Sequence, residues 1–192
     1  MSPSRKRRPF LRAIAAMAAT LALAWLPALQ AQPERGAAAT ATQLKAAFLY
    51  KFASYVEWPR KSTPGPGAPL VIGVMDSEPL MHVLAEITVG RSINDHPIEI
   101  RRLEPDDLLG GVQILFIGGE RTGDLAPLLQ LARQQPILTV TEAKGAIADG
   151  SIINFTVERD RVRFEVSLPA AESSRLRLSS RLLAVASRVH RD

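Results

Sequence analysis

The sequence of 192 residues contains no cysteine and only three histidines. The absence of cysteine excludes disulfides, zinc–thiolate sites, iron–sulfur clusters and cysteine nucleophiles. His82, His96 and His190 are far apart in the chain, and none belongs to a paired-histidine motif such as H-E-x-x-H. We therefore expect no metal site and no cofactor.

Motifs for other catalytic chemistry are also missing. The chain has no G-x-S-x-G nucleophile elbow, no S-x-x-K motif and no P-loop. Asp106 and Asp107 are the only adjacent carboxylates, and neighbours on a helix point in different directions, so we expect them to start a short helix over residues 105–109. The sequence therefore argues against an enzyme. A hydrolase remains as an alternative only if the fold brings Asp76, His96 and Ser92 into one pocket.

The chain has little excess charge once its first residues are set aside. The formal net charge is +5, but five basic residues and no acidic ones lie in residues 1–31, which leaves 19 basic and 19 acidic residues in the rest. We therefore expect no nucleic-acid binding. Local asymmetry remains, since residues 76–107 carry a net −5 and residues 169–192 a net +3. Such asymmetry can steer a protein partner or simply mark solvated surfaces.

The N-terminus has the pattern of a secretory signal peptide. Residues 1–12 are basic, residues 13–26 are apolar, and Pro27 and the small Ala31 follow. A membrane anchor is the alternative, but the apolar run is shorter than the ~20 residues that a spanning helix needs. We expect residues 1–31 to be removed, residues 32–43 to form a linker, and the mature protein to lie outside the cytoplasm.

The rest of the chain reads as one α/β domain over residues 44–192. Apolar residues at helical spacing predict a helix from Leu44 to Trp58. Short apolar runs predict strands at 70–75, 97–103, 112–117 and 137–140, with helices after the first and third of them. Alternating residues at 153–157 and 162–168 predict a β-hairpin, and the stripe Leu178, Leu182, Val185 and Val189 predicts a long last helix over about 170–189. The expected fold is a mixed, mostly parallel sheet flanked by helices.

One turn of this expected sheet lies where small ligands often bind. Residues 118–123 (GGERTG) follow a strand and precede a helix, at the carboxyl end of a parallel sheet. A tight turn explains the glycines equally well. A small-ligand sensor that uses this crevice is therefore an alternative function.

Four segments together resemble the YfiR family of exported bacterial proteins. They are residues 44–59 (LKAAFLYKFASYVEWP), 150–155 (GSIINF), 161–168 (RVRFEVSL) and 176–183 (LRLSSRLL). The resemblance extends over about residues 42–189. The sequence lacks the cysteines that form disulfides in the best-known member, and it has Ser167 where the family usually has Asn.

The resemblance implies regulation rather than catalysis. It implies a periplasmic protein that binds the periplasmic part of an inner-membrane diguanylate cyclase, holds it inactive and thereby lowers cyclic di-GMP. It also implies a homodimer and an outer-membrane, peptidoglycan-associated partner that sequesters the repressor. For this chain we expect the hairpin and last helix to form the partner-binding surface, with Phe155, Arg163, Glu165 and Arg181. Phe155 lies on the face of its strand that is expected to be buried.

Overall fold

A mixed sheet of eight strands forms the centre of the computed structural model, which describes residues 33–119 and 125–192. The strand order is β10-β8-β7-β6-β5-β2-β4-β3. β2 pairs in parallel with β4 and β5, β5 with β6, β6 with β7, and β8 with β10, whereas β7–β8 and β3–β4 are antiparallel. The strands are β2 (Leu70–Met75), β3 (Ser92–Ile93), β4 (His96–Arg102), β5 (Ile114–Ile117), β6 (Leu138–Thr141), β7 (Ile153–Glu158), β8 (Arg161–Ser167) and β10 (Arg188–His190). The expected mixed, mostly parallel sheet is confirmed.

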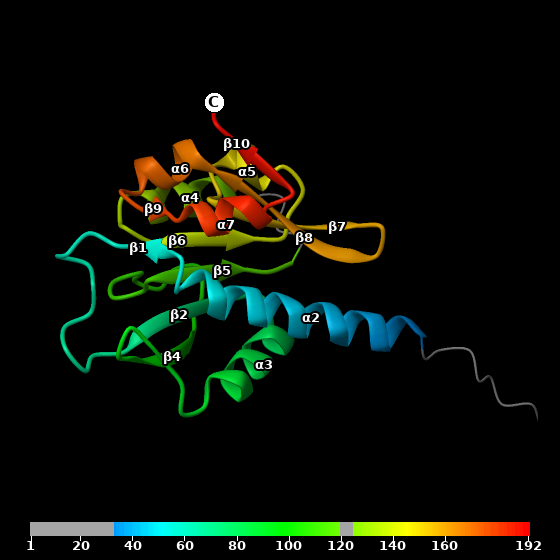
Figure 1. Ribbon diagram of the computed structural model, residues 1–192, viewed down its shortest axis with the longest axis horizontal. Coiled ribbons are helices and arrows are strands. Elements are labelled where there is room, and N and C mark those ends of the chain that lie inside the picture. Colours follow the sequence, from blue (N-terminus) through cyan, green and yellow to red (C-terminus); the bar gives the residue numbers. More distant parts are fainter. Residues whose placement is uncertain (1–32, 120–124) are drawn as a thin grey trace, which may run out of the picture. The chain divides into compact units, whose positions relative to one another are not determined.

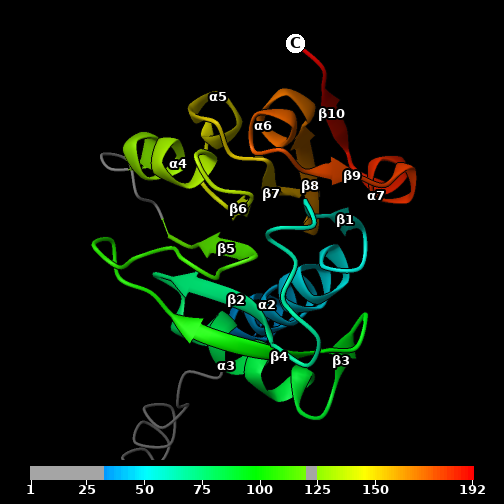
Figure 2. The ribbon, with the colours of Figure 1, turned by 90° about the vertical axis from the view of Figure 1, so that its left-hand side faces the viewer.

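Helices cover both faces of this sheet within the compact unit Ala39–Asp192 (Figures 1 and 2). The helices are α2 (Pro33–Phe52), α3 (Glu78–Thr88), α4 (Leu125–Arg133), α5 (Ala146–Asp149), α6 (Leu168–Ser173) and α7 (Ser180–Val185). Leu49 of α2, Leu84 of α3 and Leu182 of α7 belong to one buried apolar cluster. Leu129 of α4 and Ala146 of α5 belong to a second buried cluster on the opposite face of the sheet. The strand residues of this cluster alternate along β2 and β5 with those of the first cluster. Burial of both faces explains why β2 and β5 contain no polar side chain and why all four residues of β6 are buried.

The predicted β7–β8 hairpin is confirmed. Phe155 lies opposite Phe164, and the turn residues Arg159 and Asp160 both have positive φ, at 50° and 60°. Two left-handed turn residues match the right-handed twist of the strands that they connect. The hairpin extends past the neighbouring strands of the sheet (Figure 1).

The boundaries of the first helix were predicted wrongly. α2 begins at Pro33, so it occupies the segment expected to be a linker, and it ends at Phe52 rather than at Trp58. Residues 37–39 are alanines, which favour helix. After Phe52 the chain forms β1 (Val56–Glu57), which pairs with β9 (Arg177–Leu178) in a separate two-stranded sheet. The pairing of β1 with β9 therefore ends the helix before the chain reaches Pro59.

The long last helix was also predicted wrongly, since residues 168–190 form α6, β9, α7 and β10. α6 ends because Arg175 adopts the left-handed conformation, with φ 59°. The backbone N–H of Arg175 then donates to Glu172 O and that of Leu176 to Ala171 O, which is a Schellman motif with arginine in the place usually taken by glycine. Ser179 starts α7, since its side chain accepts a hydrogen bond from Leu182 N.

The short helix expected at residues 105–109 is a turn instead. Asp107 N donates to Glu104 O, and the Asp107 carboxylate accepts a hydrogen bond from Glu104 N. These reciprocal bonds satisfy the backbone without a helix. The predicted first residue of the next helix, Asp124, lies outside the described residues, and α4 is seen from Leu125.

Candidate functional site

Arg163 and Glu165 project from the same face of β8, because side chains two residues apart in a strand point the same way. Their neighbours on β7 are Thr156, opposite Arg163, and Asn154, opposite Glu165. Arg163 is exposed, and no ion pair to it occurs within residues 33–119 and 125–192. This polar face of the hairpin carries two of the four expected partner-binding residues.

Glu165 is held in place by the C-terminal strand. Its Oε2 atom lies 2.7 Å from Nε2 of His190, and the two side chains are 20% and 29% exposed. Arg188 is aligned with Glu165 in the parallel register of β10 and β8. Sequence reasoning missed His190 as a neighbour of Glu165 because it placed residue 190 after a helix rather than in a strand of the sheet.

Phe155 lies on the opposite face of the hairpin and belongs to the core. It is 4% exposed, and its ring centroid lies 5.9 Å from that of Phe52 and 6.1 Å from that of Phe48. A partner cannot contact a ring that α2 covers in this way. Any effect of Phe155 on binding therefore acts through the shape and stability of the hairpin.

Arg181 is exposed on α7, away from the polar face of the hairpin. Its helix packs through Leu182 into the same apolar cluster as Phe155. The fold therefore brings Arg163 and Glu165 together but separates both from Arg181.

A buried hydroxyl network supports the base of the hairpin. The hydroxyl Oγ1 of Thr141 donates to Asn154 Oδ1 at 2.8 Å and lies 2.9 Å from Ser151 Oγ. Thr141, Ser151 and Asn154 are all buried. These contacts fix β7 against β6 and use the serine and asparagine of the GSIINF segment, so that segment has a structural role.

Thr141→Val tests this network. We expect a loss of about 1–3 kcal/mol in the free energy of unfolding, because Asn154 Oδ1 would be left buried without a donor. Urea denaturation followed by circular dichroism measures the change. Thr156→Val is the matched control, since Thr156 Oγ1 is buried and has no hydrogen-bond partner in the described part of the chain. An equal loss in both variants would contradict a role for the network.

Gly118, in the turn where we expected a ligand crevice, packs tightly at the carboxyl ends of β2 and β5. A Cβ atom added to Gly118 would lie 2.7 Å from Ser77 Cβ and 2.9 Å from Asp76 O. Gly118 is therefore required for close packing of the two strand ends. Residues 120–123 of this segment lie outside the described residues.

Asp76, His96 and Ser92 do not form a catalytic set. β2 and β4 are parallel, with Leu70 aligned to Ile98, so His96 lies near the start of β2 and Asp76 follows its end. The length of β2 separates them by about 20 Å. Within residues 33–119 and 125–192, no cluster of three or more metal-ligating side chains occurs either.

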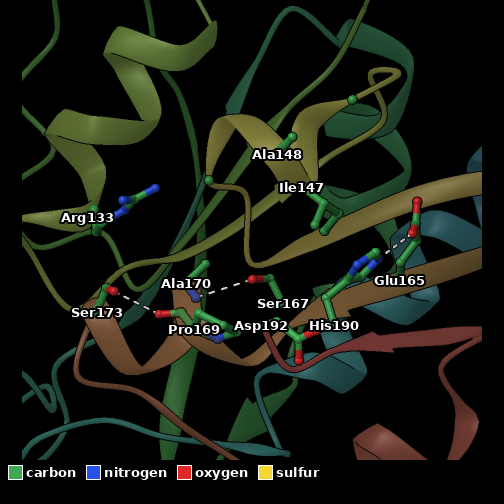
Figure 3. Close-up of a pocket in the computed structure, with 12 residues that line it drawn as sticks. Arg133, Ile147, Ala148, Glu165, Ser167, Pro169, Ala170, Ser173, His190 and Asp192 are labelled. Atoms are coloured by element: carbon green, nitrogen blue, oxygen red, sulfur yellow. Dashed lines mark hydrogen bonds and ion pairs between the residues drawn. The ribbon is translucent and has the colours of Figure 1, made fainter.

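A pocket of about 550 Å³ borders the polar face of the hairpin at Glu165 (Figure 3). Glu165 and His190 form one side and Arg133 another. The apolar part of the wall comes from α5 and from the start of α6. The residues that complete the wall are Gly145, Ile147, Ala148, Gly150, Ser167, Pro169, Ala170, Ser173 and Asp192.

A family model described as YfiR/HmsC-like matches residues 42–187. The match includes the part of α2 from residue 42 onward and the whole β2–β8 region with its hairpin, and it ends just before β10. The chain belongs to the YfiR/HmsC-like family. Members of this family are periplasmic and regulatory rather than catalytic, and they belong to cyclic di-GMP signalling.

Two further findings complete the comparison. The search of curated proteins found no match to this chain. Among the helices of residues 33–119 and 125–192, none has the length and apolar character needed to cross a bilayer.

Proposed function

We propose that this YfiR/HmsC-like protein is exported to the periplasm and represses an inner-membrane diguanylate cyclase by direct contact, which lowers cyclic di-GMP. The observation that carries the proposal is the family match over residues 42–187, which includes almost all of the compact unit. The proposal includes removal of residues 1–31 as a signal peptide, although these residues lie outside those described.

The proposed mechanism is a shift in the equilibrium between active and inactive cyclase. A repressor that binds the inactive state better than the active one moves the population toward it. A change from 1:99 to 99:1 requires about 5.5 kcal/mol of differential binding free energy.

A homodimer would present two copies of the binding surface, so each contact would need to contribute only part of this difference. We propose such a homodimer, and an outer-membrane, peptidoglycan-associated protein as a second partner that competes for the repressor.

The polar face of the hairpin is the surface that we propose for the cyclase. Arg163 is exposed there and forms no ion pair in the described part of the chain, and Glu165 is fixed beside it by His190. An unpaired, exposed arginine favours a partner with an acidic patch and increases the rate of encounter. Arg181 on α7 forms a separate candidate contact, and Phe155 supports the hairpin from within.

Deletion of the gene tests the function. We expect cellular cyclic di-GMP and biofilm formation to rise, because the cyclase would lose its repressor. A plasmid copy of the full chain should restore the original level, whereas a copy without residues 2–31 should not, since it would stay on the wrong side of the membrane. The measurement is nucleotide quantification by mass spectrometry. An unchanged nucleotide level in the deletion strain, or full repression by the copy that lacks residues 2–31, would contradict the proposal.

A further inference from the structure

Arg133 carries an unused hydrogen-bond donor at the pocket described above. Its Nε atom is buried and has no hydrogen-bond partner in the described part of the chain. A buried donor without an acceptor destabilises the fold, and more so when the group is charged. Arg133 is in the last turn of α4, where the helix dipole favours a cation, but the dipole does not explain why the guanidinium is left without an acceptor.

The backbone at Gly150 leaves room for this guanidinium. Gly150 has φ 106°, and a Cβ atom added there would overlap the end of the Arg133 side chain. The guanidinium therefore lies directly against a glycine, on one side of the pocket (Figure 3). The fold thus places a cation in a recess rather than in open solvent.

Apart from Asp192, which is exposed, the other polar side chains of the wall are already engaged. Ser167 Oγ accepts from Ala170 N at 3.2 Å, Ser173 Oγ donates to Pro169 O at 2.8 Å, and His190 pairs with Glu165. Arg133 is therefore the polar group of the wall that most lacks a partner. Its missing partner is an acceptor, and an anionic acceptor forms the strongest hydrogen bonds with a guanidinium.

The remaining wall limits the kind of anion. Ile147, Ala148 and Pro169 offer apolar contacts, and the volume of about 550 Å³ lies within the common range for small-molecule sites. Glu165 and Asp192 also line the pocket and would repel a second negative charge on the ligand. We propose that this pocket binds a small monocarboxylic acid with an apolar body, with the carboxylate on Arg133. This inference does not depend on the proposed repression of a cyclase.

Isothermal titration calorimetry with the purified protein tests the proposal, with benzoate and hexanoate as probes. We expect at least one of them to bind. We expect benzamide, which keeps the ring of benzoate without the charge, to bind at least tenfold more weakly than benzoate. Terephthalate, which adds a second carboxylate, should also bind more weakly. Amide chemical shifts in an NMR titration should change at Ile147, Gly150 and His190.

Arg133→Gln should weaken binding at least tenfold, because it removes the charge and the planar pair of donors. Arg161→Gln is the matched control, since Arg161 is exposed on β8 and does not line the pocket. If Arg133→Gln does not fold, the series of probes on the unaltered protein decides the question. Absence of binding by both acids, equal binding of benzamide and benzoate, or shifts confined to residues outside the pocket would each overturn the proposal.

Discussion

Replacing Phe155 by alanine is expected to lower the free energy of unfolding by about 4 kcal/mol. Phe155 is 4% exposed and contacts aromatic rings from α2 and β5. Truncation would leave a cavity among rings that pack at centroid distances of 5.0–6.4 Å, and these elements cannot collapse around it without moving α2. For a chain of this length the melting temperature should fall by roughly 8–16 °C.

The measurement is urea denaturation followed by circular dichroism, with repression of cyclic di-GMP assayed in parallel at a low and a high growth temperature. Val157→Ala is the matched control, because Val157 follows on the same face of β7 but is 68% exposed, so its loss should cost less than about 0.5 kcal/mol. We expect repression by Phe155→Ala to fail at the higher temperature, in step with unfolding. A stable Phe155→Ala protein that cannot repress would show instead that the ring contacts the partner directly.

The sequence was a good guide wherever a repeating pattern reflected burial. β2 and β5 are buried on both faces and appear as unbroken apolar runs, and the strands of the β7–β8 hairpin alternate apolar and polar residues. Both patterns follow from contact with helices on one or both sides of the sheet. The fold class could therefore be predicted without a structure.

The sequence was a poor guide where a backbone conformation or a distant partner decided the structure. Arg175 ends α6 in a left-handed conformation for which arginine gives no signal. Leu178 and Leu182 have helical spacing, yet the first pairs with Val56 in a strand and the second lies in α7. Local periodicity cannot distinguish one long helix from two short elements when the buried residues of those elements are also four positions apart in the sequence.

The same limit applies to the candidate sites. Arg163 and Glu165 were identified together because they are neighbours on one strand. The pocket wall, in contrast, joins Arg133, Gly150 and His190, which are far apart in the chain and which only the sheet order brings together. A residue-by-residue search for motifs could not have found it, because no short segment contains more than a few of its members.

Reversing the charge of Arg163 is expected to abolish repression without loss of stability. Arg163→Glu would place a carboxylate against the acidic patch that we propose on the cyclase, and a like-charge contact at an interface costs several kcal/mol. Cyclic di-GMP should then rise to the level of the deletion strain. Binding of the purified periplasmic domain of the cyclase, measured by biolayer interferometry, should weaken by roughly 30- to 100-fold, as expected for a loss of about 2–3 kcal/mol. Because Arg163 is exposed, the melting temperature should change little.

Two parallel variants make this result specific. Arg181→Glu tests the separate contact on α7, and Arg60→Glu is a control for charge alone, since Arg60 is exposed in the segment between β1 and β2. We expect Arg60→Glu to repress normally, because its altered charge lies outside the hairpin. If Arg163→Glu represses fully while Arg181→Glu does not, the partner binds to α7 rather than to the polar face of the hairpin. If all three variants lose repression equally, net charge rather than a defined surface controls binding, and the assignment of the hairpin is wrong.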